Sequence, residues 1–238
     1  MDDIIQQIRS TLKDRADPEI AAKGRRFFKE EVTVYGMKTS DGTTIAKSFL
    51  PSVLVREKDE IFSLCEELFA SGYMEESFIA SNWLPHLKDR FKQSDIEVFG
   101  GWIEAYVTNW ATCDTFCNHT VGDLLTQYPE CVEHLYRWAQ SENRWLRRAA
   151  AVSLIVPAKR GEFLEEAFRI ADLLLTDPED LVQKGYGWLL KEESRMHQGE
   201  VFSYVCEHKQ KMPRTALRYA IELMPDDMRT VAMKKDWK

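Results

Sequence analysis

Apolar residues recur at i, i+3, i+4 and i+7 along almost the whole chain, and no stretch sustains the apolar–polar alternation of a strand. This pattern predicts an all-α fold. The expected helices cover residues 2–14, 17–31, 42–54, 58–71, 75–92, 95–107, 111–127, 129–140, 144–157, 161–175, 178–194, 198–210 and 213–224. We expect the remainder, about residues 226–238, to form a loosely held tail.

Helix start and stop signals agree with these boundaries. Asp17-Pro18, Asp177-Pro178 and Pro213 stand at predicted starts, whereas Gly72 and Gly161 stand at predicted connections. From about residue 95, helices follow one another in pairs with a spacing of thirty-odd residues. Stacked pairs of this kind form an α-solenoid whose second helices line a concave face. No linker interrupts the pattern, so we expect a single domain over residues 1–238.

Charge constrains the choice of partner. The net charge of −7 argues against nonspecific affinity for nucleic acid, because phosphate binding depends on cations. The decisive feature is instead whether one face is locally basic. Basic residues do cluster, at Arg25, Arg26 and Lys29, at Arg147 and Arg148, at Lys184 and Lys191, and at Lys209, Lys211, Arg214 and Arg218. An acidic exterior with a basic inner face is compatible with this distribution.

Cysteine usage and apolar runs indicate a cytoplasmic protein. The five cysteines are odd in number and show no C-x-x-C spacing, which favours reduced thiols. Cys113, Cys117 and His119 lie close in sequence but lack the spacing to a second ligand pair that zinc requires, so we expect no metal. The longest apolar runs are too short to span a bilayer, and the N-terminus lacks the features of a signal peptide.

Trp110 and Asp114 form the first candidate site. Four residues apart on a helix, they share one face, so the indole lies beside the carboxylate. Two interpretations are open. Asp114 could be a functional carboxylate, or it could be a first-turn acid after an Asn109 cap, with Trp110 in the core.

Arg148 and Trp188 extend the candidate site. Helical spacing turns Trp145, Ala149 and Val152 toward the core and leaves Arg148 on a flank. There, its guanidinium could hold a phosphate or a carboxylate such as Asp114, or simply remain solvated.

Trp188 shares a stripe with Lys184 and Lys191, opposite a packed side formed by Val182, Gly185, Tyr186 and Leu189. This placement suits a surface that meets phosphates and sugars. Lysine stems that cover a half-buried ring are the alternative.

Together these residues resemble the AlkD family of DNA alkylation repair glycosylases. The resemblance covers nearly the whole chain, and its most specific parts are Trp110-x-x-x-Asp114, Trp145-Leu-x-Arg-Ala-Ala150 and Lys184-x-x-Gly-Trp-x-Leu-Lys-Glu192. It implies an α-solenoid of HEAT-like repeats with a concave DNA-facing surface. The implied activity is hydrolysis of the N-glycosidic bond of positively charged 3- and 7-alkylated purines in duplex DNA.

The resemblance also implies residue roles. Asp114 matches the catalytic carboxylate, Trp110 and Trp188 match the aromatic pair beside the lesion, and Arg148 matches the arginine near the phosphate. Candidate DNA contacts are Phe27, Lys184, Lys191, Arg214 and Arg218. Phe27 stands where a tyrosine is usual, and Ala111 where an acid is often found.

The leading hypothesis is therefore a monofunctional glycosylase that acts as a monomer, without cofactor or metal and without flipping the base into a pocket. The first alternative is a noncatalytic binder of distorted or branched DNA on the same scaffold. The second is a protein-interaction solenoid, which predicts no basic concave stripe. The preferred lesion is left open.

Overall fold

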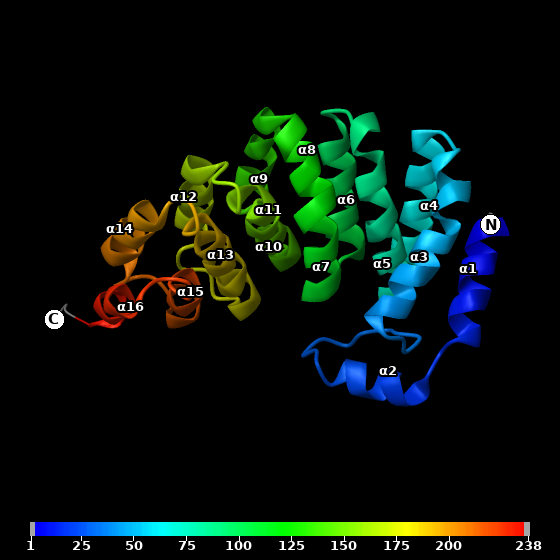
Figure 1. Cartoon of the computed structure of the whole chain (residues 1–238), viewed down its shortest axis with the longest axis horizontal. Coiled ribbons are helices and arrows are strands. Elements are labelled where there is room, and N and C mark those ends of the chain that lie inside the picture. The colour runs from blue at the N-terminus through cyan, green and yellow to red at the C-terminus, as the bar shows by residue number, and fades with distance from the viewer. Residues whose placement is uncertain (1–2, 236–238) are drawn as a thin grey trace. The chain divides into compact units, whose positions relative to one another are not determined.

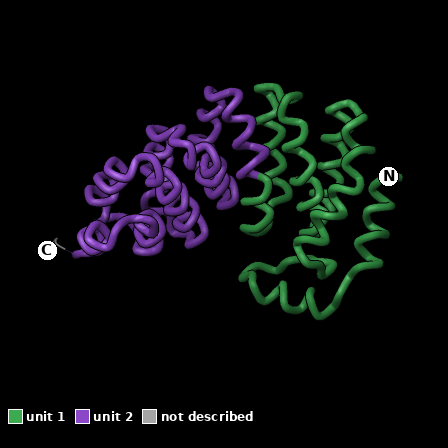
Figure 2. The backbone as a smooth tube through the Cα atoms, viewed as in Figure 1, with its two compact units in different colours: residues 1–116 green, residues 117–238 purple. Residues whose placement is uncertain are grey.

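A computed structural model describes residues 3–235. Within that range, regular secondary structure is helical apart from one isolated bridge between Thr33 and Tyr73, which confirms the all-α prediction. The chain divides into two compact units, unit 1 (residues 1–116) and unit 2 (residues 117–238), coloured separately in Figure 2. The single-domain expectation stays a prediction.

Unit 1 consists of seven α-helices and one 3₁₀ segment within its described residues (Figure 1). In chain order they are α1 (Asp3–Asp14), α2 (Pro18–Arg25), α3 (Thr39–Leu54), α4 (Lys58–Ala70), α5 (Met74–Trp83), η1 (Leu84–Arg90), α6 (Asp95–Tyr106) and α7 (Trp110–Phe116). Helix α5 packs against α3, α4 and α7, and α4 packs against α6. These boundaries lie close to those predicted, except after α2 and within the helix predicted over residues 75–92. That helix is α-helical only as far as Trp83 and continues as η1, where Pro85 has no N–H to donate.

An aromatic cluster forms the core of unit 1. Phe62 and Phe69 come from α4, and Phe99 and Trp102 come from α6. The rings of Phe69, Phe99 and Trp102 meet that of Phe116 at the end of α7, and Phe62 packs on Phe99 and Trp102. The Phe116 ring lies edge-on to Phe69, with centroids 5.4 Å apart, and edge-on to Phe99, with centroids 5.6 Å apart. Such edge-to-face pairs add to the stability gained from burial alone. The cluster fixes the C-terminal end of α7.

The helix predicted over residues 17–31 ends at Arg25, so its second half was predicted wrongly. The segment that follows alternates, with Val32 and Val34 buried and Thr33 exposed between them. Both valines pack on Ala21 with the half-buried Phe28. Because these three side chains pack back on Ala21 of α2, the chain turns after Arg25 instead of continuing as a helix. The alternating β-branched residues then favour an extended backbone.

Unit 2 consists of nine α-helices, one π-helical turn and one 3₁₀ turn within its described residues. They are η2 (Cys117–Val121), α8 (Gly122–Gln127), η3 (Pro129–Cys131), α9 (Val132–Trp138), α10 (Arg144–Val152), α11 (Ile155–Ala158), α12 (Leu164–Leu173), α13 (Asp180–Glu193), α14 (Gln198–His208), α15 (Arg214–Ala220) and α16 (Asp226–Met233). The single helix predicted over residues 111–127 is therefore α7, the π-helical turn and α8 in succession.

Helix α13 lies at the centre of unit 2 and packs against α10, α11, α12 and α15. A side chain at Gly187 would place its Cβ 2.7 Å from the carbonyl oxygen of Ala216, so the close approach of α13 and α15 requires glycine there. On the opposite side of α13 from Gly187, the residues Val182, Tyr186 and Leu189 are almost fully buried, as the sequence pattern predicts.

Two predictions in unit 2 need correction. The helix expected over residues 144–157 is broken after Val152, because Pro157 has no N–H to donate to the carbonyl of Ser153 and its ring crowds that carbonyl. The tail expected from residue 226 forms helix α16 as far as Met233, with Ala232 fully buried. Lys209 Nζ donates to the carbonyl of Val231, which ties α16 down. Residues 236–238 lie outside the described range.

Candidate functional site

Asp114 projects from α7, one turn after Trp110. The helix begins after Asn109, whose side-chain oxygen accepts the N–H of Thr112 at 3.0 Å, as a capping residue does. Cys113 and Phe116 face the core, and Asp114 is 9% exposed while Trp110 is partly exposed. Asn109 thus acts as the predicted cap. However, Asp114 is the fifth residue of α7 rather than a first-turn acid, and Trp110 does not belong to the core.

Phe27, Phe28 and Trp110 form an aromatic cluster beside Asp114. Phe28 stacks on Trp110 with ring centroids 5.5 Å apart and planes inclined by 27°. Phe27 lies 6.3 Å from the Trp110 ring, yet its side chain is 77% exposed. A solvent-facing aromatic ring next to another is a common platform for the faces of bases and sugars. The sequence alone did not indicate Phe28 as a site residue, because its position in the chain has no periodic relation to the residues of α7.

Buried carboxylates hold the segment that carries this aromatic cluster. Glu75 accepts the backbone N–H of Tyr35 at 3.0 Å and that of Gly36 at 2.9 Å. Glu76 accepts the hydroxyl of Tyr35 at 2.8 Å and pairs with Arg9 at 3.0 Å. Such charge-assisted bonds compensate for burying the two carboxylates. Burial, followed by the bond to Glu76, raises the pKa of Tyr35 well above its usual range.

Trp188 lies on α13 with Lys184 one turn before it and Lys191 one turn after it. The indole is partly exposed, and its Nε1–H donates to the Glu192 carboxylate at 3.1 Å. Lys184 pairs with Asp180 at 2.7 Å, and Lys191 pairs with Glu222 at 3.3 Å. The predicted stripe exists, but both of its lysines also have acidic partners.

Arg148 is buried rather than solvated, with 5% of the residue exposed. Its Nη1 donates to the carbonyl of Leu181, at the start of α13. The placement on a flank was therefore wrong, although Trp145, Ala149 and Val152 are buried as expected. The reason is α13, which packs over α10. Gly185 lies against Arg148, and a Cβ on it would be at ordinary contact distance, 3.5 Å, from Arg148 Cγ.

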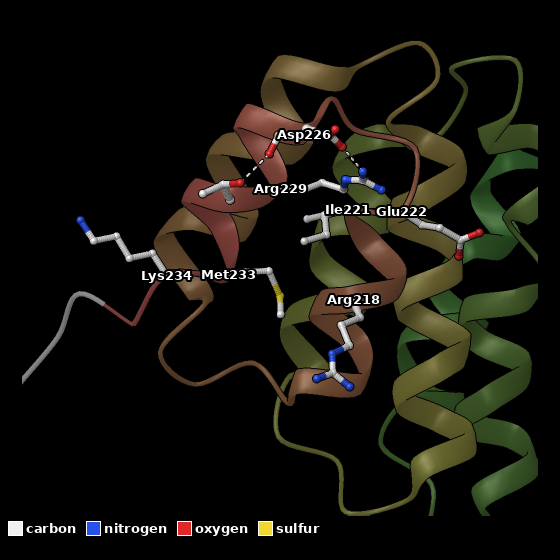
Figure 3. Close-up of a pocket in the computed structure, with 8 residues that line it drawn as sticks. Arg218, Ile221, Glu222, Asp226, Arg229, Met233 and Lys234 are labelled. Carbon is white, nitrogen blue, oxygen red and sulfur yellow. Dashed lines mark hydrogen bonds and ion pairs between the residues drawn. The ribbon is translucent and has the colours of Figure 1, made fainter.

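Arg214 and Arg218 lie on α15. Arg214 Nη2 donates to the carbonyl of Met233 at 3.0 Å, which ties α15 to α16. Arg218 is exposed and lines a cleft of about 880 Å³ between these helices (Figure 3). The cleft has mixed charge, since it is also lined by Arg229 and Asp226, which pair with each other one turn apart on α16.

The predicted site residues are divided between the two units. The structure brings Phe27, Trp110 and Asp114 together in unit 1. Unit 2 holds Arg148, Lys184, Trp188, Lys191, Arg214 and Arg218, on α10, α13 and α15. A joint site that includes both groups stays a prediction.

Metal-binding clusters and membrane-spanning helices are both absent from residues 3–235. No group of three or more His, Cys, Asp or Glu residues in that range could hold a metal ion. None of the helices in the same range is long and apolar enough to cross a membrane. Within the same range none of the five cysteines forms a disulfide, and burial raises the pKa of Cys65 well above its usual range.

Comparison with known proteins identifies the family. Residues 8–224 match the family described as "DNA alkylation repair enzyme". A solved structure named "Predicted DNA alkylation repair enzyme from Enterococcus faecalis" has the same fold, with a TM-score of 0.79 over 89% of this chain and 97% of that chain, at 18% identity. No curated protein sequence matches the chain. Because the family match covers most of its length, the chain belongs to the DNA alkylation repair enzyme family and has a role in alkylation repair.

Proposed function

We propose that this protein is a monofunctional DNA glycosylase that hydrolyses the N-glycosidic bond of cationic N3- and N7-alkylated purines in duplex DNA. The observation that carries the proposal is the arrangement in unit 1. There, Asp114, a carboxylate that is 9% exposed, lies one helical turn after Trp110, and the exposed ring of Phe27 lies 6.3 Å from the Trp110 ring. The proposal also draws on the family, whose role is alkylation repair.

The chemistry requires little from the protein beyond a negative charge in the right place. Alkylation at a ring nitrogen makes the purine cationic, so the base can leave as a neutral molecule without a general acid. The bond between C1′ and the base nitrogen breaks, its electron pair goes to the base, and positive charge develops on the sugar. Asp114 would stabilise that charge and orient the water that adds to C1′ and releases a proton.

Aromatic faces complement the carboxylate. Trp110 in unit 1 and Trp188 in unit 2 are both partly exposed, so each can present a ring face to a sugar. A ring face attracts a cation more strongly as the charge on the sugar grows, which favours the transition state over the ground state. With the lesion still stacked in the duplex, no base-shaped pocket is needed. Lys184, Lys191 and Arg218 would contact phosphates, and the two lysines would exchange their acidic partners for them.

The test is the release of free base from methylated duplex DNA, assayed for both 7-methylguanine and 3-methyladenine. A duplex that contains uracil is the matched control, because uracil is uncharged in the nucleoside and would have to leave as an anion. The proposal predicts release of at least one cationic base and no release of uracil. If the protein releases neither cationic base but binds branched duplexes tightly, it is a noncatalytic binder of distorted DNA on the same scaffold.

A further inference from the structure

Glu192 is a buried carboxylate on α13 that contacts the candidate site residue Trp188. Only 4% of the residue is exposed. One carboxylate oxygen accepts the indole N–H of Trp188 at 3.1 Å, and the other accepts Nε–H of Arg195. The sequence motif contains Glu192 but indicates no purpose for it.

The surroundings of Glu192 keep it ionised. Burial by itself would raise the pKa of this carboxyl group. Hydrogen bonds from Arg195 and Trp188, together with the charges of Arg195 and Lys159, outweigh burial and lower the pKa below its usual range. The indole N–H therefore meets a full negative charge at neutral pH.

This bond constrains a ring that packing alone holds only in part. Gly187 and Leu189, on either side of Trp188, are buried, whereas Trp188 itself is partly exposed. The torsion of an indole about its second side-chain bond is broad, so a half-packed ring has rotational freedom. A charge-assisted bond from Nε1 selects one orientation. It also draws the N–H proton toward the carboxylate, which increases the electron density on the ring face.

We propose that Glu192 is a positioning residue that fixes the Trp188 ring and strengthens its attraction for a positively charged sugar. This inference rests on the proposed function, because it assigns to Trp188 a cationic ligand. It adds a source of selectivity. A ring polarised by a carboxylate favours a cationic nucleoside over a neutral one more strongly than an unpolarised ring does.

The test compares two duplexes that differ by one charge. One carries a pyrrolidine in place of a deoxyribose and is cationic at that position, and the other carries a neutral tetrahydrofuran. We expect Glu192→Gln to weaken binding of the pyrrolidine duplex by about threefold to tenfold and to leave the tetrahydrofuran duplex nearly unchanged. Glu200→Gln, at an exposed position on α14, is the matched control and should change neither affinity.

A second variant shows whether Glu192 acts through the indole. Phenylalanine has no N–H, so Glu192→Gln should have no further effect on affinity in a Trp188→Phe background. In the intact chain, the Nε1–H proton resonance of Trp188 should move upfield in Glu192→Gln. The Trp188 resonance is identified as the one that disappears from the spectrum of the Trp188→Phe variant. This readout needs no DNA.

The outcomes separate the two proposals. If the intact protein prefers the pyrrolidine duplex and Glu192→Gln keeps the full preference, the role of Glu192 is overturned while the proposed function stands. An equal loss of affinity for both duplexes makes Glu192 merely structural and also overturns the role. If the intact protein binds both duplexes alike, the result contradicts the proposed function itself, which requires attraction for a cationic sugar.

Discussion

Phe28 stacks on Trp110 at 5.5 Å although the two residues come from different parts of unit 1. Phe28 belongs to the irregular segment after α2, and Trp110 is the first residue of α7. Phe28 also packs against the small apolar cluster that contains Val32 and Val34. Phe28 therefore connects the core of that segment to the ring beside Asp114.

Replacement of Phe28 by alanine should loosen Trp110. Loss of a half-buried aromatic pair should lower the free energy of unfolding by about 1–3 kcal/mol. Phe27→Ala is the matched control, because a ring that is 77% exposed should contribute within about 0.5 kcal/mol. Urea unfolding followed by tryptophan fluorescence measures both variants. Equal free energies of unfolding for the two would contradict the anchoring role of Phe28.

Gly36 should tolerate no side chain. Its φ is +94°, and a Cβ there would lie 2.2 Å from the carbonyl oxygen of Asp17. Gly72 also has a positive φ, +74°, but no atom lies within 4 Å of its Cβ position. Gly72→Ala should therefore cost only about 1 kcal/mol of backbone strain. Gly36→Ala should cost clearly more, because the chain must also move apart at Asp17. Thermal unfolding of the two variants side by side would detect the difference, and equal losses would count against it.

The sequence could predict the helices because their burial is local and periodic. Trp145, Ala149 and Val152 are buried with the spacing of one helix face, and Val182, Tyr186 and Leu189 likewise. Asn109 caps α7 as its residue type predicts. Asp114 and Trp110 lie on one face because four residues on a helix always do.

Other features depend on partners far away in sequence. Glu75 and Glu76 are buried because Tyr35, Gly36 and Arg9 supply donors, and no local pattern indicates that pairing. Arg148 is buried because α13 covers it, which a single-helix projection cannot show. Helix α16 was missed because its apolar face is short, and its attachment comes from Lys209 and Arg214.

Glu193 should make stability depend on pH. The residue is fully buried, and within the described range neither carboxylate oxygen has a hydrogen-bond partner. Burial, followed by the nearby charge of Glu166, raises its pKa to about 8. In the unfolded chain the carboxyl titrates near its ordinary value, about 4.3. The stabilisation of the neutral form is thus complete below that value and is lost as pH rises toward 8, at up to about 1.4 kcal/mol per pH unit.

Glu193→Gln removes this titration, so its unfolding free energy should fall less between pH 5 and pH 8 than that of the intact protein. Chemical unfolding at several pH values measures the slope. Glu207→Gln, at an exposed position, is the control and should keep the slope of the intact protein. Parallel profiles for Glu193→Gln and the intact protein would show that Glu193 does not titrate in this range.

Asp180 should compete with DNA for Lys184. In the free protein, Asp180 pairs with this lysine at 2.7 Å. Asp180→Asn should therefore strengthen binding to duplex DNA, and Lys184→Gln should weaken it and reduce the salt dependence of log K by about 0.9. Lys47→Gln, at an exposed position on α3, is the charge-matched control. Binding titrations at several salt concentrations measure both effects. Equal changes for Lys184→Gln and Lys47→Gln would exclude a phosphate contact at Lys184.

The most direct measurement compares Asp114→Asn with the intact protein for both base excision and DNA binding. Single-turnover release of 7-methylguanine and 3-methyladenine gives the chemical step, and affinity for an undamaged duplex gives binding. If the carboxylate stabilises the developing cation, excision should fall by at least about 100-fold while affinity is retained. Asp89→Asn, at an exposed position, should leave both unchanged. Undiminished excision by a folded Asp114→Asn protein would contradict the central claim.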